Sequence, residues 1–378
     1  MSDRVYGVKS GFKNLLLRSL GKKRILFASH EVTSKCMCRC KTCPIWRMKE
    51  THEPDLKTEK MIIDRFKEAG VVVAVFTGGE PLLRKDIPEI LKYSYDSGFV
   101  TSVVTNGYLL KNRAKEFYKF VDRICVSLDS ANPQVHNKIR GIKIFDRAVE
   151  GIKSAVDLGA YVIINCVISK YNIDHVEDVL YLGEKLGVSG VLFDPVQASF
   201  FGGDFSHIAF NEKEYKALKE KIQLLSDLKK QGHKVMNTTR YLNFLLEPEK
   251  FENVKCDTFG IKVKWDGKAY PAVCNYGFEQ PGFLKNGISL ENHSINEIIE
   301  REDVKKAIEM MGNCRRCNIS CIWEPILSLG SLTGFFEMGI DTSKSGYWIA
   351  NAPNDGLRWL DPLIDYIFAR NNKKKQIE

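Results

Sequence analysis

Hydrophobic positions in the first half of the chain form short, β-branched runs that alternate with longer amphipathic stretches. Such runs predict buried strands, and helical spacing between them predicts covering helices near 59–69, 85–97, 110–119, 144–158 and 174–186. Strand–helix alternation of this kind indicates an α/β fold with a parallel sheet and right-handed crossovers. The six units are too few for a full eight-stranded barrel, so a partial barrel and an open doubly wound sheet both fit. Of these two we expect the partial (β/α)6 TIM-type barrel. The predicted strands are Ile25–Val32, Val71–Thr77, Val100–Thr105, Arg123–Leu128, Tyr161–Ile168 and Val191–Val196.

The second half of the chain loses this rhythm after Val196. An aromatic, glycine-rich loop covers 197–210, and a helix is predicted over 211–231. Further on, Asp266-Gly267 is a hairpin turn signal between two short apolar runs, and five cysteines lie between residues 256 and 321. These features predict a second, small, cysteine-ligated module. We expect five segments: a basic amphipathic segment (1–24), the main α/β core (25–210), a helical linker (211–255), the cysteine module (256–325) and a C-terminal apolar segment with a helix and basic tail (326–378).

The net charge of +9 arises at the two ends of the chain. Residues 1–24 carry a net +6 and residues 370–378 a net +3, which leaves the body of the chain neutral. A nucleic-acid enzyme normally concentrates positive charge around its working cleft, so this distribution argues against a nucleic-acid partner. No secretory signal and no apolar window of about 18 residues is present, so we expect a cytoplasmic protein. No pattern indicates an obligate oligomer.

The first cysteine cluster directly follows the first predicted strand. Cys36, Cys40 and Cys43 have the spacing Cys-x3-Cys-x2-Cys. Three thiolates on one short loop can hold three corners of a [4Fe-4S] cluster and leave the fourth iron open for a ligand. A zinc knuckle with Cys38 as the fourth ligand is the alternative. Otherwise Cys38 is a buried thiol.

This motif, in its place after the first strand of an α/β repeat, resembles that of the radical S-adenosylmethionine (SAM) superfamily. The resemblance covers about residues 25–200 and includes Thr77-Gly78-Gly79-Glu80-Pro81, which is similar to the family's glycine–glycine–glutamate motif. Paired glycines allow a close backbone approach to a ligand, and a carboxylate can bind its ammonium group. One departure is Thr42, where the family often has an aromatic residue; Trp46 is a candidate replacement for that adenine contact.

The resemblance implies further SAM-binding residues at the strand ends. Ser127 and Asp129 correspond to residues that reach the ribose hydroxyls, and Arg140 resembles the arginine that meets the methionine carboxylate. Each could instead be a helix cap or turn former. The implied cofactor-binding set is Gly78, Gly79, Glu80, Asn106, Ser127, Asp129, Arg140, Asn165 and Ser169.

Membership of this family would imply a specific chemistry. The open iron would chelate SAM, and electron transfer would cleave SAM to methionine and a 5′-deoxyadenosyl radical that abstracts hydrogen from an unactivated C–H bond. The cofactor would supply the chemistry while the protein positions it and excludes water. An electron donor such as flavodoxin or ferredoxin is the implied partner.

The second cysteine cluster resembles the SPASM and shorter twitch extensions of radical enzymes, which hold auxiliary clusters. Five cysteines are fewer than a full SPASM domain uses for two clusters, so the resemblance implies one auxiliary [4Fe-4S] cluster. A structural zinc ribbon is the alternative. Cys125 and Cys166, inside strands, are expected to be packed thiols. The auxiliary candidates are Cys256, Cys274, Cys314, Cys317 and Cys321.

The substrate is not encoded in these motifs. A cationic amphipathic pattern within residues 9–20 and an apolar stripe before Lys373–Lys375 raise the hypothesis of peripheral docking on the inner membrane face, with a lipid or lipid-linked substrate. The alternative is that terminal helices close the core and the lysine tail is solvated. Two other functions remain open: a SPASM-type maturase that modifies a peptide or protein, and a non-catalytic zinc- or cluster-binding interaction protein.

Overall fold

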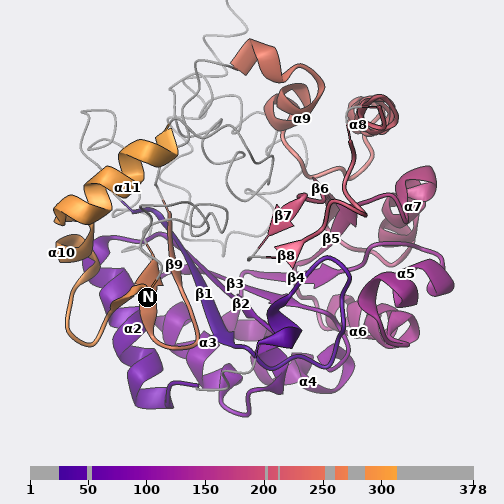
Figure 1. Cartoon of the computed structure of the whole chain (residues 1–378). Coiled ribbons are helices and arrows are strands. Elements are labelled where there is room, and N and C mark those ends of the chain that lie inside the picture. The colour runs from indigo at the N-terminus through magenta and orange to yellow at the C-terminus, as the bar shows by residue number, and fades with distance from the viewer. Residues whose placement is uncertain are drawn as a thin grey trace, which may run out of the picture.

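The protein is built on one curved, mostly parallel sheet. The computed structural model describes residues 25–48, 53–200, 203–211, 213–251, 260–270 and 286–312. Within these residues the sheet has nine strands in the order β11-β10-β9-β1-β2-β3-β4-β5-β6. The strands β9 and β1 to β6 run parallel, and β10 and β11 extend one edge in antiparallel fashion. The sheet curves with helices along its outer side and ends at the edges β6 and β11, so it is a partial barrel, as the sequence predicts (Figure 1).

All six predicted strands are present, with ends displaced by at most two residues. Their alternate residues face the helix layer, where Ala28, Val103, Val126, Ile164 and Phe193 belong to one buried hydrophobic cluster. The strands are β1 (Phe27–Thr33), β2 (Val73–Gly78), β3 (Val100–Thr105), β4 (Arg123–Ser127), β5 (Val162–Ile168), β6 (Gly190–Pro195), the short pair β7 (Ser199–Phe200) and β8 (Gly203–Asp204), β9 (Gly260–Val263), β10 (Lys268–Tyr270) and β11 (Ile288–Ser289).

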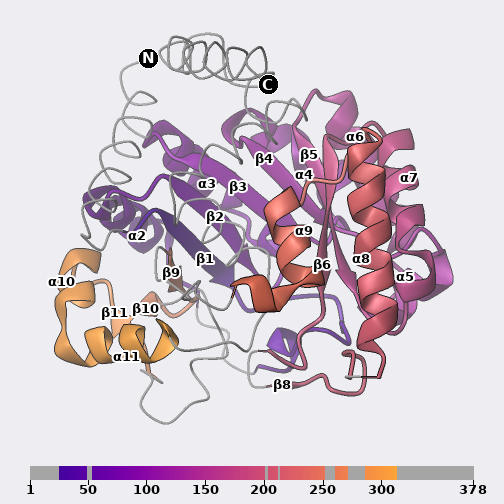
Figure 2. The same ribbon diagram turned by 90° about the horizontal axis from the view of Figure 1, so that it is seen from above.

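The helices α2 to α7 lie along the outer side of the curved sheet (Figure 1). In the view from above, α8 and α9 lie beside β6, and α10 and α11 lie beside β9 to β11 at the other end (Figure 2). The helices are α2 (Leu56–Ala69), α3 (Ile87–Asp96), α4 (Leu110–Phe117), α5 (Pro133–Arg140), α6 (Phe145–Asp157), α7 (Glu177–Lys185), α8 (Tyr215–Lys230), α9 (Thr239–Leu246), α10 (Ile295–Glu300) and α11 (Glu302–Gly312).

Local capping explains where several helices begin and end. The Asp55 side chain accepts a hydrogen bond from the Thr58 amide at the start of α2, and Gly70 ends that helix with a φ of +78°. Helix α5 was not predicted, because Val135 and Ile139 are its only apolar residues at helical spacing. It begins at Asn132-Pro133, a favoured N-cap and first-turn pair, and ends at Gly141 in the left-handed conformation.

The hairpin around Asp266-Gly267 joins the main sheet. Strand β9 pairs in parallel with β1, from Phe27 opposite Gly260 to His30 opposite Val263, and pairs antiparallel with β10. The hairpin is therefore directly beside the strand that leads into the first cysteine cluster. None of the helices within the described ranges is long and apolar enough to cross a membrane. The predicted terminal helices lie outside those ranges.

Candidate SAM and iron–sulfur site

The segment 34–48, called here the cysteine loop, leaves the carboxyl end of β1 and packs against α5. The amides of Arg39 and Lys41 donate to the carbonyls of Arg140 (2.9 Å) and Ile139 (2.8 Å), which are the last residues of α5. Gly141 has a φ of +72°, and a Cβ there would lie 2.4 Å from the Arg39 carbonyl oxygen. The end of α5 thus requires glycine both for its conformation and for the close approach of the cysteine loop.

The predicted glycine pair lies against the cysteine loop itself. The amide of Gly79 donates to the Thr33 carbonyl and that of Glu80 to the Lys35 carbonyl, both at 2.7 Å. A Cβ at Gly78 would lie 2.3 Å from the Thr33 oxygen, and one at Gly79 would lie 2.2 Å from the Lys35 oxygen. The close approach that we expected towards a ligand is made towards the backbone that leads into Cys36. These glycines therefore fix the position of the cysteine loop.

Glu80 is fully buried at the end of β2 and hydrogen-bonded to the end of β3. Its carboxylate accepts from Thr105 Oγ1 (2.7 Å), the Asn106 amide (2.7 Å) and the Leu82 amide (3.0 Å). Burial raises the pKa of Glu80 to about 7, although these hydrogen bonds act in the opposite direction. The carboxylate is thus held rigidly by its own chain.

Asn106 lies beside the first cysteine. Its Nδ2 lies 3.1 Å from Met37 Sδ and 3.9 Å from Cys36 Sγ, while its Oδ1 accepts from the Tyr108 amide (2.9 Å). Three predicted residues, Glu80, Asn106 and Cys36, therefore lie together at the carboxyl ends of β1, β2 and β3.

Asp129 and Arg140 form a buried ion pair on the other side of the cysteine loop. Arg140 Nη2 donates to Asp129 Oδ1 (2.9 Å), and Arg140 Nη1 lies 3.9 Å from Cys40 Sγ. Arg140 Nε lies 2.7 Å from Asp129 Oδ2, but both atoms lack an aligned hydrogen-bond partner. The pair thus retains hydrogen-bonding capacity beside Cys40.

Ser127 and Asn165 are neighbours in register on β4 and β5. Asn165 Oδ1 is buried and has no hydrogen-bond partner among the described residues. Buried carbonyl oxygens normally have a partner, so a donor from a bound molecule suits this position. Ser169 is different, because its hydroxyl bonds Asn172 Oδ1 (3.1 Å) and accepts from the Tyr171 amide (3.3 Å).

Sequence reasoning did not single out His136 and Asn172, which hold the backbone of Asp129. His136 Nδ1 accepts from the Asp129 amide (3.1 Å), and Asn172 Nδ2 donates to the Asp129 carbonyl (2.6 Å). Burial lowers the pKa of His136 to about 4, so the ring stays neutral and its Nδ1 can accept. Neither residue has a spacing that marks it in the sequence.

The thiols of the cysteine loop lie in unequal environments. A hydrogen bond from Cys38, assisted by the positive charge of Arg140, lowers the pKa of Cys40 to about 6. The Cys38 hydrogen bond also lowers the pKa of Cys36, whereas burial raises the pKa of Cys43 to about 12. A positive neighbour favours the thiolate that a metal requires.

The donor set of the cysteine loop fits a [4Fe-4S] cluster with one open iron, because three thiols lie on one short loop and each thiolate can bond a different iron. The thiols of Cys36 and Cys40 are both in hydrogen-bonding contact with that of Cys38. Cys38 is itself buried.

Two further cysteines and Trp46 lie in the described part of the chain. Cys125 and Cys166 are buried within strands, as predicted. Trp46 Nε1 donates to the Cys40 carbonyl (3.2 Å), and the guanidinium groups of Arg39 and Arg47 lie 5.3 and 4.8 Å from the centre of its ring. The five auxiliary candidates, from Cys256 to Cys321, lie outside the described residues.

Comparisons with known proteins agree with this geometry. Residues 30–182 match the Radical SAM superfamily. Curated relatives include an AdoMet-dependent heme synthase of Oleidesulfovibrio alaskensis, 30% identical over 48% of this chain and 49% of the relative. A probable GTP 3',8-cyclase of Saccharolobus islandicus is 35% identical over 47% of this chain and 57% of the relative. The chain thus spans about half the length of these curated relatives.

Solved structures share the fold at low sequence identity. Streptococcus suis SuiB bound to S-adenosylmethionine has a TM-score of 0.63 and 15% identity over 78% of this chain and 70% of its own. The anSMEcpe structure with bound AdoMet and Cp18Cys peptide has a TM-score of 0.60 and 17% identity over 84% of this chain and 96% of its own. The segment that matches the Radical SAM superfamily, residues 30–182, holds the cysteine loop, Glu80 and the Asp129–Arg140 pair.

Proposed function

We propose that the chain is a radical SAM enzyme that uses a [4Fe-4S] cluster on Cys36, Cys40 and Cys43. When bound, the cluster supplies the electron that cleaves SAM to methionine and a 5′-deoxyadenosyl radical, which takes a hydrogen atom from an unactivated C–H bond. The observation that carries this proposal is the meeting of the three cysteines, Glu80 and Arg140 at the carboxyl edge of a parallel sheet, where α/β enzymes bind their ligands.

The chain's own residues have distinct roles in this proposal. Arg140 faces the cysteine loop and would bind the methionine carboxylate, with Asp129 fixing its orientation. Glu80, held by Thr105 and Asn106, would orient the SAM amino group. Ser127 and Asn165 lie in register at the adjacent strands and would accept or donate hydrogen bonds to the nucleoside, which suits the unpaired Asn165 oxygen.

Anaerobic reconstitution tests the proposal, with Cys40→Ser and Cys38→Ser as a matched pair of variants in the same loop. About four irons per chain for this cluster, and about eight if an auxiliary cluster forms, are expected in the wild type. Reductant-dependent 5′-deoxyadenosine should appear in the wild type and in Cys38→Ser but not in Cys40→Ser. Zinc binding without SAM cleavage would defeat the proposal.

The auxiliary module remains part of the proposal. One further [4Fe-4S] cluster on four of the five cysteines between residues 256 and 321 would account for the higher iron content. Replacing Cys256 and Cys317 together should reduce bound iron by about half, because the cluster on Cys36, Cys40 and Cys43 would retain about four irons. An unchanged iron content, or zinc at this site, would contradict it.

A peptide or protein is one substrate class that we propose. The fold is shared with SuiB bound to precursor peptide SuiA, at a TM-score of 0.62 and 14% identity over 81% of this chain and 73% of its own. The test is hydrogen transfer from a deuterated peptide encoded near this protein's gene. Deuterium in the 5′-deoxyadenosine would support this class.

A lipid or lipid-linked substrate at a membrane surface is the other proposal, and it rests on the basic residues 1–24 and 370–378. A flotation assay with vesicles containing anionic lipid tests it, comparing the whole chain with one lacking residues 1–24. Unchanged partitioning between the two chains would remove that support.

A further inference from the structure

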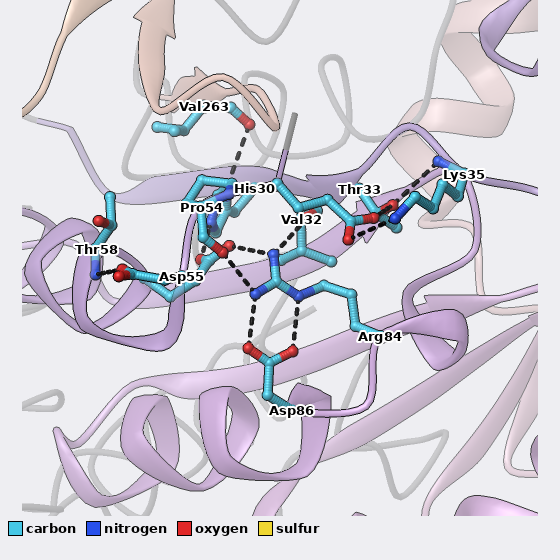
Figure 3. Close-up of polar contacts among 12 residues, drawn as sticks. His30, Val32, Thr33, Lys35, Pro54, Asp55, Thr58, Arg84, Asp86 and Val263 are labelled. Carbon is cyan, nitrogen blue, oxygen red and sulfur yellow. Dashed lines mark hydrogen bonds and ion pairs between the residues drawn. The ribbon is translucent and has the colours of Figure 1, made fainter. Parts of the chain in front are cut away.

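Arg84 uses every hydrogen-bond donor of its guanidinium on the surrounding protein. It follows η2 (Pro81–Leu83), directly after the glycine–glycine–glutamate motif. Its Nε and Nη2 donate to the two oxygens of Asp86 (3.0 and 2.8 Å), and its Nη1 donates to Glu59 Oε1 (2.8 Å). The remaining two N–H groups donate to the carbonyls of Val32 and Pro54, both at 2.9 Å. Figure 3 shows these contacts converging on one side chain.

The two carbonyls belong to opposite ends of the segment that carries the cluster cysteines. Val32 lies in β1, just before the cysteine loop, and Pro54 lies just before α2. One planar guanidinium therefore joins the outgoing and returning chain. Lysine cannot reproduce this bridge, because its ammonium is a single point without the fork geometry.

The guanidinium is itself fixed to the sheet and the helix layer. Its acceptor Glu59 lies on α2, and Glu59 Oε2 lies 2.5 Å from His30 Nε2. His30 is on β1, in edge contact with the rings of Phe66 and Phe76, and its Nδ1 lies 3.4 Å from the Val263 carbonyl on β9. The side chains of His30 and Glu59 are completely buried, and that of Arg84 is 4% exposed.

A second contact lies at the same place. Glu53 accepts hydrogen bonds from Thr33 Oγ1 and from Lys35 Nζ, the latter at 3.0 Å. It too joins the two ends of the segment, but its partner Lys35 is half exposed. Arg84 therefore joins the two ends through buried contacts, whereas the Glu53–Lys35 ion pair joins them at the surface, where it contributes less.

We propose that Arg84 is a positioning residue that closes the base of the cysteine loop and so presets Cys36, Cys40 and Cys43 for cluster binding. The inference rests on the proposed function. A loop whose ends are fixed loses less conformational freedom when its thiolates bind iron, so the cluster is held more tightly. Freeing one end lets the thiolates separate and iron leave.

The experiment compares Arg84→Lys with Arg113→Lys. Arg113 is a matched control, because its guanidinium supports the same turn through the carbonyls of Leu82 and Arg84 (both 2.6 Å) without touching the cysteine loop. The first measurement is the rate of iron loss from equally loaded proteins to an excess of ferrous chelator. We expect the rate of iron loss to rise about tenfold or more for Arg84→Lys, because losing a hydrogen bond to a charged group typically changes an equilibrium by about tenfold or more. For Arg113→Lys the rate should rise less than about twofold, because its contacts do not reach the cysteine loop.

The second measurement needs no cluster. Trypsin can cleave the iron-free protein after Lys35, Arg39, Lys41 and Arg47, which are exposed. We expect Arg84→Lys to accelerate these cleavages relative to cleavage within α8, whereas general destabilisation would accelerate both. Asp86→Asn removes one of the two carboxylate oxygens that accept from Arg84, so it should also raise the rate of iron loss and accelerate cleavage of the cysteine loop. This variant replaces Arg84→Lys if Arg84→Lys does not fold.

The outcomes separate this inference from the proposed function. Faster iron loss and selective loop cleavage in Arg84→Lys, with Arg113→Lys like the wild type, support the inference. Wild-type behaviour in Arg84→Lys, or equal changes in both variants, overturns it. If the wild type binds no cluster, the proposed function fails, and selective cleavage of the iron-free chain alone decides whether Arg84 ties the loop.

Discussion

Two buried arginines lie on opposite sides of the cysteine loop, and they differ in how fully they are bonded. Arg84 has an aligned acceptor for each of its five N–H groups, all from the protein. Arg140 has one aligned bond to Asp129, a distant contact with Cys40, and an Nε without an aligned acceptor. Both are charged and buried, so burial alone does not distinguish them.

From this difference we propose that Arg84 serves the scaffold and that Arg140 serves a ligand. Arg140 Nε lies 2.7 Å from Asp129 Oδ2 without an aligned hydrogen bond, and a bound carboxylate can accept a better-aligned one. The Arg84 guanidinium has no N–H group left to donate to a ligand, because all five donate to the protein. We therefore expect changes at Arg84 to affect stability and loop order first, and changes at Arg140 to affect SAM binding first.

The largest expected effect is on stability at Arg84. Arg84→Leu leaves Glu59 and Asp86 without their counter-charge, and Glu59 is fully buried. Breaking a buried pair in this way should lower the free energy of unfolding by about 3–5 kcal/mol, measured by urea denaturation of the iron-free protein. The control is Lys111→Leu, which removes an exposed pair with Glu150 and should cost less than about 1 kcal/mol. Equal losses in the two variants would contradict the scaffold role.

The second effect is a pH dependence that arises at Glu80, beside Asn106 at the end of β3. Burial raises the pKa of Glu80 from 4.5 to about 7. The folded protein then binds more protons than the unfolded chain between these values, so stability should fall as pH rises from about 4.5 to 7, by at most about 3 kcal/mol. Glu80→Gln should remove that slope. Parallel pH profiles of unfolding for the two proteins would show that Glu80 is not the cause.

The third effect separates binding from stability at Arg140. Arg140→Lys keeps a positive charge beside Asp129 but loses the planar fork, so we expect SAM affinity to fall by about 10- to 100-fold. Equilibrium binding of SAM to reconstituted protein measures it, with the exposed Arg147→Lys as control. A large loss of stability with unchanged SAM affinity would make Arg140 a second scaffold arginine.

The smallest effect sharpens the same distinction with two asparagines. Asn165→Ala removes an oxygen that has no hydrogen-bond partner within the described part of the chain. Stability should therefore change by less than about 0.5 kcal/mol while SAM binding weakens by about tenfold. Asn172→Ala removes bonds to the carbonyls of Asp129 and Val167 (2.6 and 2.9 Å) and should cost about 1–3 kcal/mol. The reverse order of stabilities would refute the assignment of Asn165 to a ligand.

The parallel core was predictable because its signals are local. The β-branched runs and the glycines after each helix placed the strands β1 to β6 within two residues. The pairing of β9 with β1 was not predictable, because Gly260 and Phe27 are far apart in sequence and a hairpin signal does not specify which edge it joins. Helix α5 was missed because only Val135 and Ile139 within Pro133–Arg140 are apolar residues at helical spacing.

The site was predictable only where residue types carry a motif. The cysteine spacing and Gly78-Gly79-Glu80 led directly to the ends of β1 and β2, although the structure shows that the glycines contact the loop backbone. Arg84, His136 and Asn172 act through tertiary contacts with carbonyls and amides, which leave no pattern in the sequence. Their importance depends on which backbone groups the fold brings to them.

The parallel pairing of β9 with β1 has a consequence for the order of folding. One edge of β1, the strand that leads into the cysteine loop, finds its partner only in residues 260–263, and His30 and Val263 are 233 positions apart. A chain emerging from the ribosome therefore keeps that edge open through most of its synthesis. Contacts of such long range form late and slowly, so the strand before the cysteine loop is completed near the end of folding. We therefore expect the loop to bind its metal only after nearly the whole protein has assembled.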